Sequence, residues 1–222
     1  MSQSKIRVIV TGATGMVGEG VLHVCLESPD VEQVLIINRR SAGVTHPKLK
    51  EIVCRDFFNL TAVENQLSNV DACFFCLGVS SVGMKEEEYY KLTYALTTTF
   101  AKALATQSPN ATFCYVSGAS TDSTEKGKSM WARVKGKTEN DLMKIFKNAY
   151  NFRPGVMVPI EGMKNTLGFY KYLGWMIPII RAISPKLVCH LEDVGKAMIN
   201  AAIKKYEKQV LEVPDIVALS KR

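Results

Sequence analysis

The chain has 222 residues, of which 47% are hydrophobic and 22% charged, and its formal net charge at pH 7 is +7. This balance is typical of a folded globular protein and excludes disordered, collagen-like and coiled-coil chains. The positive charge favours an acidic ligand, but it does not distinguish a phosphate compound from nucleic acid or an anionic membrane.

The first two thirds of the chain alternate short apolar runs with longer segments of helical periodicity. The apolar runs predict strands at Lys5–Val10, Gln33–Ile37, Glu51–Cys54, Asp71–Leu77, Thr112–Val116 and Tyr150–Arg153. The helical spacing predicts helices at Met16–Glu27, Glu86–Thr106 and Ser129–Lys147. This alternation predicts a doubly wound α/β fold, with a parallel sheet and helices on both of its faces.

The pattern changes after residue 154. There we expect a helix at Glu161–Ala182, a strand at Leu187–Cys189, a helix at Glu192–Lys205 and a strand at Val210–Val213. No repeat, low-complexity tract or long linker interrupts the chain. We therefore predict one domain over residues 1–222, in which residues 155–222 contribute a small lobe on the substrate side.

Part of this lobe raises the question of membrane contact. Residues 167–183 are mostly apolar, but Lys171, Pro178 and Arg181 interrupt them. The uninterrupted apolar stretch is far shorter than the roughly 20 residues of a spanning helix. A core or lid segment is therefore favoured over peripheral membrane contact.

A glycine-rich run, Thr11-Gly12-Ala13-Thr14-Gly15-Met16-Val17-Gly18, follows the first predicted strand and opens the first predicted helix. In that context Gly12 permits a tight turn, Gly15 lets a pyrophosphate approach the backbone, and Gly18 lets the helix pack near the sheet. The helix N-terminus offers free N–H groups to an anion. The alternative is a turn without a ligand. The favoured interpretation is a dinucleotide loop whose contacts come from Gly12, Thr14, Gly15, Met16 and Val17.

The end of the second predicted strand indicates which dinucleotide binds. A carboxylate is usual there in proteins that bind NAD, because it accepts a hydrogen bond from the ribose 2′-hydroxyl. This chain instead has Asn38-Arg39-Arg40, and two guanidinium groups suit a 2′-phosphate. NADP is therefore favoured over NAD, the alternative being that both arginines are solvated surface residues.

Two further strand ends are candidate cofactor contacts. Asp56-Phe57 follows the third predicted strand, where a carboxylate could accept a hydrogen bond from the adenine amine. Asp at that place is also an ordinary turn residue. Leu77-Gly78 ends the fourth strand, and a glycine there would let the chain pass close to the cofactor.

Taken together, these motifs resemble the short-chain dehydrogenase/reductase superfamily, and within it the atypical branch of Tat-interacting-protein-like and small epimerase-like proteins. The matching stretches are TGATGMVGEGV, INRR, CFFCLG, YVSGAST, WARVKGKTEN and FRPGVMVP, which occur in the expected order between Lys5 and Pro159. The resemblance implies a Rossmann fold, loop glycines that hold NADP, and an arginine that binds the 2′-phosphate. Beyond Pro159 the match is weaker.

The resemblance also implies a catalytic set, from which this chain departs. The superfamily uses a serine after the fifth strand and a Tyr-x-x-x-Lys pair, in which lysine lowers the tyrosine pKa and binds the nicotinamide ribose. Lys135 matches the lysine, but Trp131 stands at the tyrosine position. An indole N–H cannot relay a proton as a phenol does. Two hypotheses follow, namely an NADP-dependent reductase or epimerase-like enzyme with an unusual site, and a non-catalytic NADP-binding redox sensor or regulatory partner.

The remaining members of the implied site are a serine, a turn beside the nicotinamide and a replacement phenol. Either Ser117 or Ser120 matches the superfamily serine, and Ser117 is favoured as the nearer to the cofactor, although both could simply cap a turn. The stretch Arg153-Pro154-Gly155 resembles the turn that sets backbone groups against the nicotinamide, so Pro154 and Val156 are added to the cofactor contacts. The candidates for a replacement phenol are Tyr115, Tyr89 and Tyr170.

Other features are interpreted as structural. Cys73 and Cys76 imitate a metal or redox pair, but residues three apart on a strand point to opposite faces, and the three histidines are scattered, so no metal site is predicted. No nucleic-acid motif accompanies the lysines of residues 126–147.

The six cysteines indicate free thiols and no secretory signal is recognisable, so we expect a cytoplasmic protein. The substrate and the oligomeric state stay open.

Overall fold

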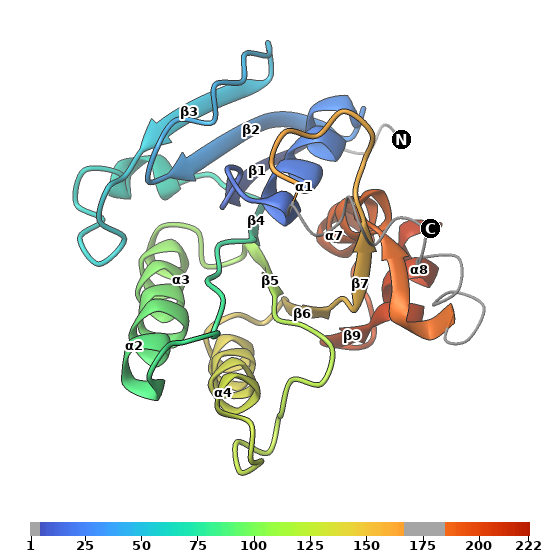
Figure 1. Cartoon of the computed structure of the whole chain (residues 1–222). Coiled ribbons are helices and arrows are strands. Elements are labelled where there is room, and N and C mark those ends of the chain that lie inside the picture. The colour runs from blue at the N-terminus through green and yellow to red at the C-terminus, as the bar shows by residue number, and fades with distance from the viewer. Residues whose placement is uncertain (1–4, 167–184) are drawn as a thin grey trace.

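The computed structural model describes residues 5–166 and 185–222. Its main sheet has seven strands in the order β3-β2-β1-β4-β5-β6-β9, and every neighbouring pair is parallel (Figure 1). The strands are β1 (Ile6–Thr11), β2 (Val31–Asn38), β3 (Leu49–Val53), β4 (Ala72–Phe75), β5 (Thr112–Val116), β6 (Ala149–Arg153) and β9 (Val210–Glu212). Two short strands, β7 (Val156–Val158) and β8 (Val188–His190), form a separate parallel pair.

Helices cover both faces of the sheet, which confirms the predicted doubly wound α/β fold. One face carries α1 (Met16–Glu27), α7 (Leu191–Lys204) and α8 (Val213–Ser220). The other carries α3 (Leu96–Gln107), α4 (Met130–Ile145) and the short η1 (Glu64–Leu67). Helix α2 (Glu86–Tyr90) continues through the π-helical turn η2 (Lys91–Ala95) into α3, and the short η3 (Pro185–Leu187) precedes β8. The order reverses between β1 and β4, so a crevice is expected beyond their carboxyl ends.

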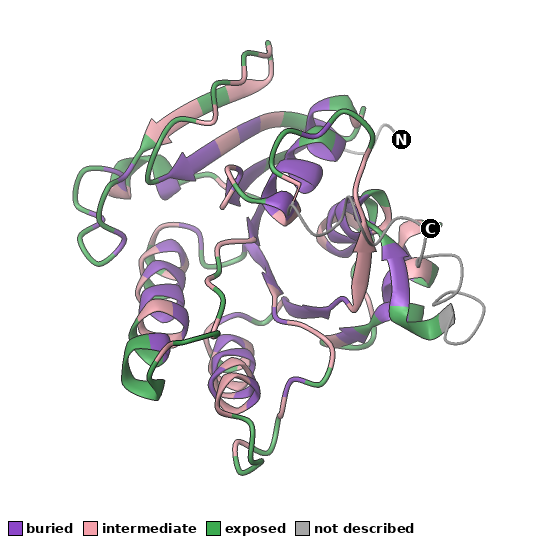
Figure 2. Ribbon diagram, in the orientation of Figure 1, coloured by how far each residue is buried: buried purple, intermediate pink, exposed green. Residues whose placement is uncertain are grey.

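The central strands alternate between two cores, as a strand covered on both faces must. In β4, Ala72 and Phe74 join the core beneath α1, α7 and α8, whereas Cys73 and Phe75 join the core beneath α3 and α4. All four side chains are fully buried (Figure 2). Cys76 packs against the first core, so Cys73 and Cys76 point to opposite faces as expected.

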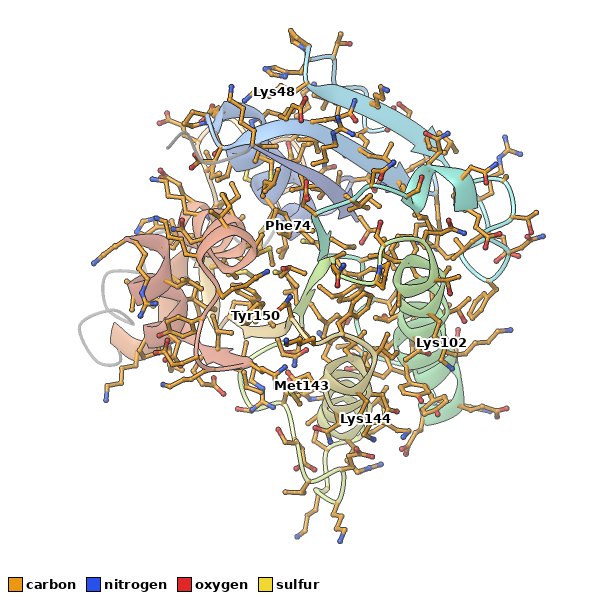
Figure 3. The ribbon with its side chains drawn as sticks, turned by 180° about the vertical axis from the view of Figure 1, so that it is seen from behind. Lys48, Phe74, Lys102, Met143, Lys144 and Tyr150 are labelled. Carbon is orange, nitrogen blue, oxygen red and sulfur yellow. The ribbon has the colours of Figure 1, made fainter. Side chains whose placement is uncertain are left out.

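The side chains show the same layering from behind. Phe74 of β4 and Tyr150 of β6 belong to the core beneath α1, α7 and α8, and they lie within the molecule (Figure 3). Lys102 of α3 and Lys144 of α4 are exposed and project outward from their helices. The amphipathic spacing of these two helices therefore places their apolar faces on the sheet.

The structure departs from the predicted elements mainly after residue 153. The predicted helix at 161–182 does not begin as expected, because residues 161–166 form turns and bends; the rest of it, with the apolar segment 167–183, lies outside the described residues. Strand β7 was not predicted, because Pro154-Gly155 ends β6. A Cβ at Gly155 would lie 2.3 Å from the Leu187 carbonyl oxygen, so glycine lets the chain continue close to η3.

Helix α8 was not predicted either. The sequence predicts a strand that includes Val213, but the strand stops at Glu212 and the helix begins at Val213. Pro214 in its first turn and a capping box between Glu212 and Asp215 explain the early start. None of the described helices is long and apolar enough to cross a membrane.

Candidate functional site

A cavity of about 520 Å³ opens beyond the carboxyl ends of β1, β2 and β4. This is the point where the strand order reverses, and ligands of open α/β sheets bind at such points. The residues that line it are Gly12, Thr14, Gly15, Asn38, Arg39, Arg40, Cys76, Leu77 and Gly78. The structure therefore brings half of the predicted cofactor residues together, and it adds Asn38 and Cys76, which the sequence pattern did not indicate.

The glycine loop owes its shape to two backbone requirements. Gly12 has φ +73°, and a Cβ there would lie 2.8 Å from the Cys76 carbonyl oxygen, so only glycine fits. A Cβ at Gly18 would lie 2.1 Å from the Gly12 carbonyl oxygen. Gly18 thus lets the helix pack against the loop itself, whereas the sequence suggested packing against the sheet.

The N-terminus of α1 is open toward the cavity. Gly15 precedes the helix in an extended conformation, and no side chain caps the helix there. A Cβ at Gly15 would meet only the Gly12 carbonyl oxygen, at 3.4 Å, so the space beside it is free of protein atoms. The first N–H groups of a helix lack intrahelical partners and favour an anion. This cradle fits a pyrophosphate.

Asn38 connects the end of β2 to the glycine loop. Its side chain is buried, and its Oδ1 accepts a hydrogen bond from the Ala13 N–H at 3.0 Å. Its Nδ2 has no hydrogen-bond partner among the described residues, although it is buried. From the sequence, Asn38 was interpreted only as a missing carboxylate. The signal that could have found it was a short polar side chain between an apolar strand and the arginines.

Arg39 and Arg40 are exposed at the edge of the cavity. Neither guanidinium has a hydrogen-bond or ion-pair partner among residues 5–166 and 185–222. The loop that follows is fixed by Glu51, whose carboxylate accepts hydrogen bonds from the Ser41 hydroxyl at 2.5 Å and the Ala42 N–H at 2.7 Å. Two uncompensated positive charges are thus held beside the cavity.

Several predicted cofactor residues do not line this cavity. They are Met16, Val17, Asp56, Phe57, Lys135, Pro154 and Val156. The Asp56 carboxylate accepts a hydrogen bond from the Phe58 N–H at 2.9 Å, and the buried Phe57 ring packs 5.8 Å from the Phe100 ring. The Asp56 side chain therefore stabilises its own turn, and the Phe57 side chain packs in the core.

Two members of the catalytic set that the resemblance implies, Ser117 and Lys135, lie in contact. The Lys135 ammonium donates a hydrogen bond to the Ser117 carbonyl oxygen. The Ser117 hydroxyl donates to the Phe152 carbonyl oxygen at 3.1 Å. Ser120 is exposed and has φ +68°, a left-handed turn conformation. Trp131 is half-buried and lies one helical turn before Lys135 on α4.

Glu139, one helical turn after Lys135 on α4, forms a buried ion pair with Arg153. Glu139 is fully buried, and its carboxylate accepts hydrogen bonds from the Arg153 guanidinium at 3.0 and 2.5 Å. Arg153 also donates to Glu212 at 3.3 Å and to the Ser123 hydroxyl at 2.6 Å. Arg153 therefore ties α4 to β6 and β9, a structural role that its place in the Arg-Pro-Gly turn did not suggest.

Burial determines the proton affinity of Lys135. Desolvation lowers its pKa to about 8, while the negative charge of Glu139 opposes the shift. Because Glu139 is already paired with Arg153, burial outweighs the attraction. The Lys135 ammonium therefore loses its proton more readily than the ammonium of an exposed lysine.

This shift yields a prediction for Lys135→Met. Between pH values of about 8 and 10.5, the unfolded chain binds the Lys135 proton more than the folded chain does. The wild-type free energy of unfolding should therefore rise across this interval by up to about 3 kcal/mol from this group, and the variant should lack that rise. Urea denaturation on both sides of the interval measures the difference. Parallel pH dependences of the two proteins would contradict a desolvated Lys135.

The positions of Tyr115 and Tyr89 do not support either residue as a replacement for the missing catalytic tyrosine. Tyr115 and Tyr89 are 2% and 1% exposed, and burial raises the pKa of both. Such phenols hold their protons and do not reach a substrate. Tyr170 lies outside the described residues. Within the described ranges, no group of three or more His, Cys, Asp or Glu side chains could hold a metal ion.

Comparisons with known proteins agree with this geometry. The model of the NAD dependent epimerase/dehydratase family matches residues 8–129. Similar curated proteins include "Protein FMP52, mitochondrial" of Meyerozyma guilliermondii, 24% identical over 216 residues that cover 94% of this chain and 90% of the relative. The protein of the same name from Aspergillus fumigatus is 28% identical over 222 residues, covering 91% and 89%.

Solved structures support the fold. The UDP-N-acetylglucosamine 4-epimerase of Methanobrevibacter ruminantium has a TM-score of 0.66 and 17% identity, covering 93% of this chain and 75% of that one. The Bordetella bronchiseptica enzyme WbmF, solved with NAD+, has a TM-score of 0.67 and 14% identity, covering 100% and 79%. At such identities the likeness concerns the fold alone.

The expectation of a cytoplasmic protein was wrong, because the curated relatives are named mitochondrial. All six cysteines are free. Free thiols do not identify a compartment, so a cytoplasmic location could not be inferred from the cysteines.

Proposed function

The chain belongs to the NAD-dependent epimerase/dehydratase family, and from that premise we propose that it binds NADP(H), in preference to NAD(H), in the cavity beyond β1, β2 and β4. The observation that carries the preference is the pair Arg39 and Arg40, which are exposed and have no partner among the described residues. Asn38 offers no carboxylate to repel a 2′-phosphate. A bidentate contact with each guanidinium suits that group.

The remaining contacts follow from the cavity lining. The open N-terminus of α1 and the bare Gly15 would hold the pyrophosphate. Thr14, Leu77 and Gly78 would flank the dinucleotide. The unpartnered Asn38 Nδ2 adds a hydrogen-bond donor beneath the same cavity. Bound NADPH would supply a hydride. The residues of this chain would have to orient the cofactor and provide any proton that the reaction needs.

Substitution of the two arginines tests the preference. We expect Arg39→Ala with Arg40→Ala to weaken NADPH binding by about 1.5–3 kcal/mol for each guanidinium–phosphate hydrogen bond that the substitutions remove. NADH binding should stay nearly unchanged, because NADH lacks the 2′-phosphate. Calorimetric titration of both cofactors into wild type and variant measures this. Equal affinity of the wild type for NADPH and NADH would refute the preference.

We propose further that the protein is an atypical reductase or epimerase-like enzyme in which Lys135 and Ser117 take the positions that the resemblance implies. The hydrogen bond from Lys135 to the Ser117 carbonyl supports this pairing. Lys135 would bind the nicotinamide ribose, and the Ser117 hydroxyl would polarise the substrate oxygen. Trp131 cannot relay a proton, so reduction of generic carbonyl compounds should be slow.

A second candidate function is a non-catalytic NADP-binding redox sensor or regulatory partner. Trp131 at the proton-donor position favours it, as does the burial of Tyr115 and Tyr89. NADPH oxidation with a panel of aldehydes and ketones discriminates the two. Turnover above the protein-free rate supports the enzyme, whereas tight binding with no turnover on any compound supports the sensor.

A further inference from the structure

Glu19 is a buried carboxylate in the same helix, α1, whose N-terminus faces the cavity. It is 6% exposed, and its two oxygens accept hydrogen bonds from the backbone N–H groups of Lys164 and Asn165, each at 2.7 Å. No cationic side chain among the described residues pairs with it. One carboxylate thus holds two consecutive N–H groups that lie far along the chain from it.

A second contact attaches the same segment to the helix. Met163 is buried against Met16, the first residue of α1, and against Leu191, the first residue of α7. Met16 follows Gly15 directly, so this contact lies next to the open helix N-terminus. Residues 160–166 are therefore attached to α1 at its first residue and at the buried carboxylate one turn later.

We propose that Glu19 is a positioning residue that couples dinucleotide binding at the α1 N-terminus to the placement of residues 160–166. The inference rests on the proposed function, since it takes NADPH as the anion bound there. Glu19 lies within the first turn of α1, where a bound pyrophosphate would sense its negative charge. The two N–H donors offset that charge when residues 160–166 are in place.

Release of the segment would leave the Glu19 charge without these donors beside the anion. NADPH should therefore bind more tightly to the state in which Glu19 holds residues 164 and 165, and this differential affinity is what shifts the equilibrium. The coupling is reciprocal, so loosening the segment should weaken NADPH binding by the same factor by which NADPH protects the segment.

Amide hydrogen exchange at Lys164 and Asn165 tests the coupling without any activity assay. In the wild type we expect saturating NADPH to slow exchange at both amides. In Glu19→Gln one acceptor oxygen is replaced by a donor, so exchange without NADPH should be about tenfold faster or more. The slowing by NADPH should shrink, because the neutral glutamine no longer disfavours NADPH binding to the released state of residues 160–166. The control Glu27→Gln changes an exposed carboxylate at the other end of α1 and should behave as wild type.

The outcomes separate this inference from the proposed function. If NADPH binds the wild type but leaves exchange at both amides unchanged, the coupling is refuted and the cofactor site stands. If NADPH does not bind, both are refuted. If Glu19→Gln fails to fold, Met163→Ala loosens the segment without touching the carboxylate. That variant should also exchange faster and bind NADPH more weakly, and wild-type behaviour of it would overturn the coupling.

Discussion

Gly15→Val is expected to abolish NADPH binding while the protein stays folded. The backbone at Gly15 is extended, with φ −112° and ψ 164°, which a β-branched residue adopts readily. A Cβ there would meet only one protein atom, at 3.4 Å, so the fold can accept the side chain. The added methyl groups would instead fill the space next to the α1 N-terminus that a pyrophosphate needs. Calorimetric titration with NADPH measures the loss.

Gly18→Ala, in the first turn of α1, is the contrasting variant, because its added methyl group would meet protein atoms and not the free space beside Gly15. Its Cβ would lie 2.1 Å from the Gly12 carbonyl oxygen, so this variant should lose stability by about 1–3 kcal/mol, as overpacked sites do. Circular dichroism must show Gly15→Val to be native-like for the comparison to count. Retained NADPH affinity in a native-like Gly15→Val protein would refute the assignment of the loop.

Trp131→Tyr is expected to raise NADPH-dependent carbonyl reduction by roughly 10²–10⁴-fold, the usual contribution of general acid catalysis. Trp131 and Lys135 lie one turn apart on α4, so a phenol at position 131 would stand on the same helix face as the Lys135 ammonium. Protonated Lys135 would lower the pKa of that phenol and favour proton exchange. Initial rates of NADPH oxidation with a panel of aldehydes and ketones measure the gain.

Two further variants identify the source of the proton. Adding Lys135→Met to Trp131→Tyr should remove the gain, because the phenol pKa is then no longer lowered. Trp131→Phe should leave the low wild-type rate unchanged. A gain that does not depend on Lys135 would mean that α4 is not placed as proposed relative to the cofactor. A fast wild type, unaffected by Trp131→Phe, would place the proton donor elsewhere.

Much of the sheet could be predicted because its strands carry strong local signals. The run from Ala72 to Phe75 is apolar throughout, as a strand buried on both faces must be, and its side chains do alternate between two cores. The tight turn at Gly12 was equally predictable, whereas Gly18 proved to pack against the loop and not against the sheet. Some boundaries shifted by a residue or two, as with β2, which begins at Val31.

The parts that could not be predicted depend on contacts between distant segments. Nothing local indicates that Glu19 holds Lys164 and Asn165, or that Arg153 pairs with Glu139. Phe57 follows a strand at a place typical of adenine contacts, but its ring packs in the core. These contacts depend on how the helices and strands pack together. The sequence pattern of a single element does not specify which elements become its neighbours.

A crystal structure of the protein with saturating NADPH tests the central claim most directly. We expect the pyrophosphate against the N-terminus of α1 beside Gly15, the 2′-phosphate between Arg39 and Arg40, and the nicotinamide ribose within hydrogen-bond reach of Lys135. A nucleotide bound elsewhere, or a 2′-phosphate that touches neither arginine, would contradict it.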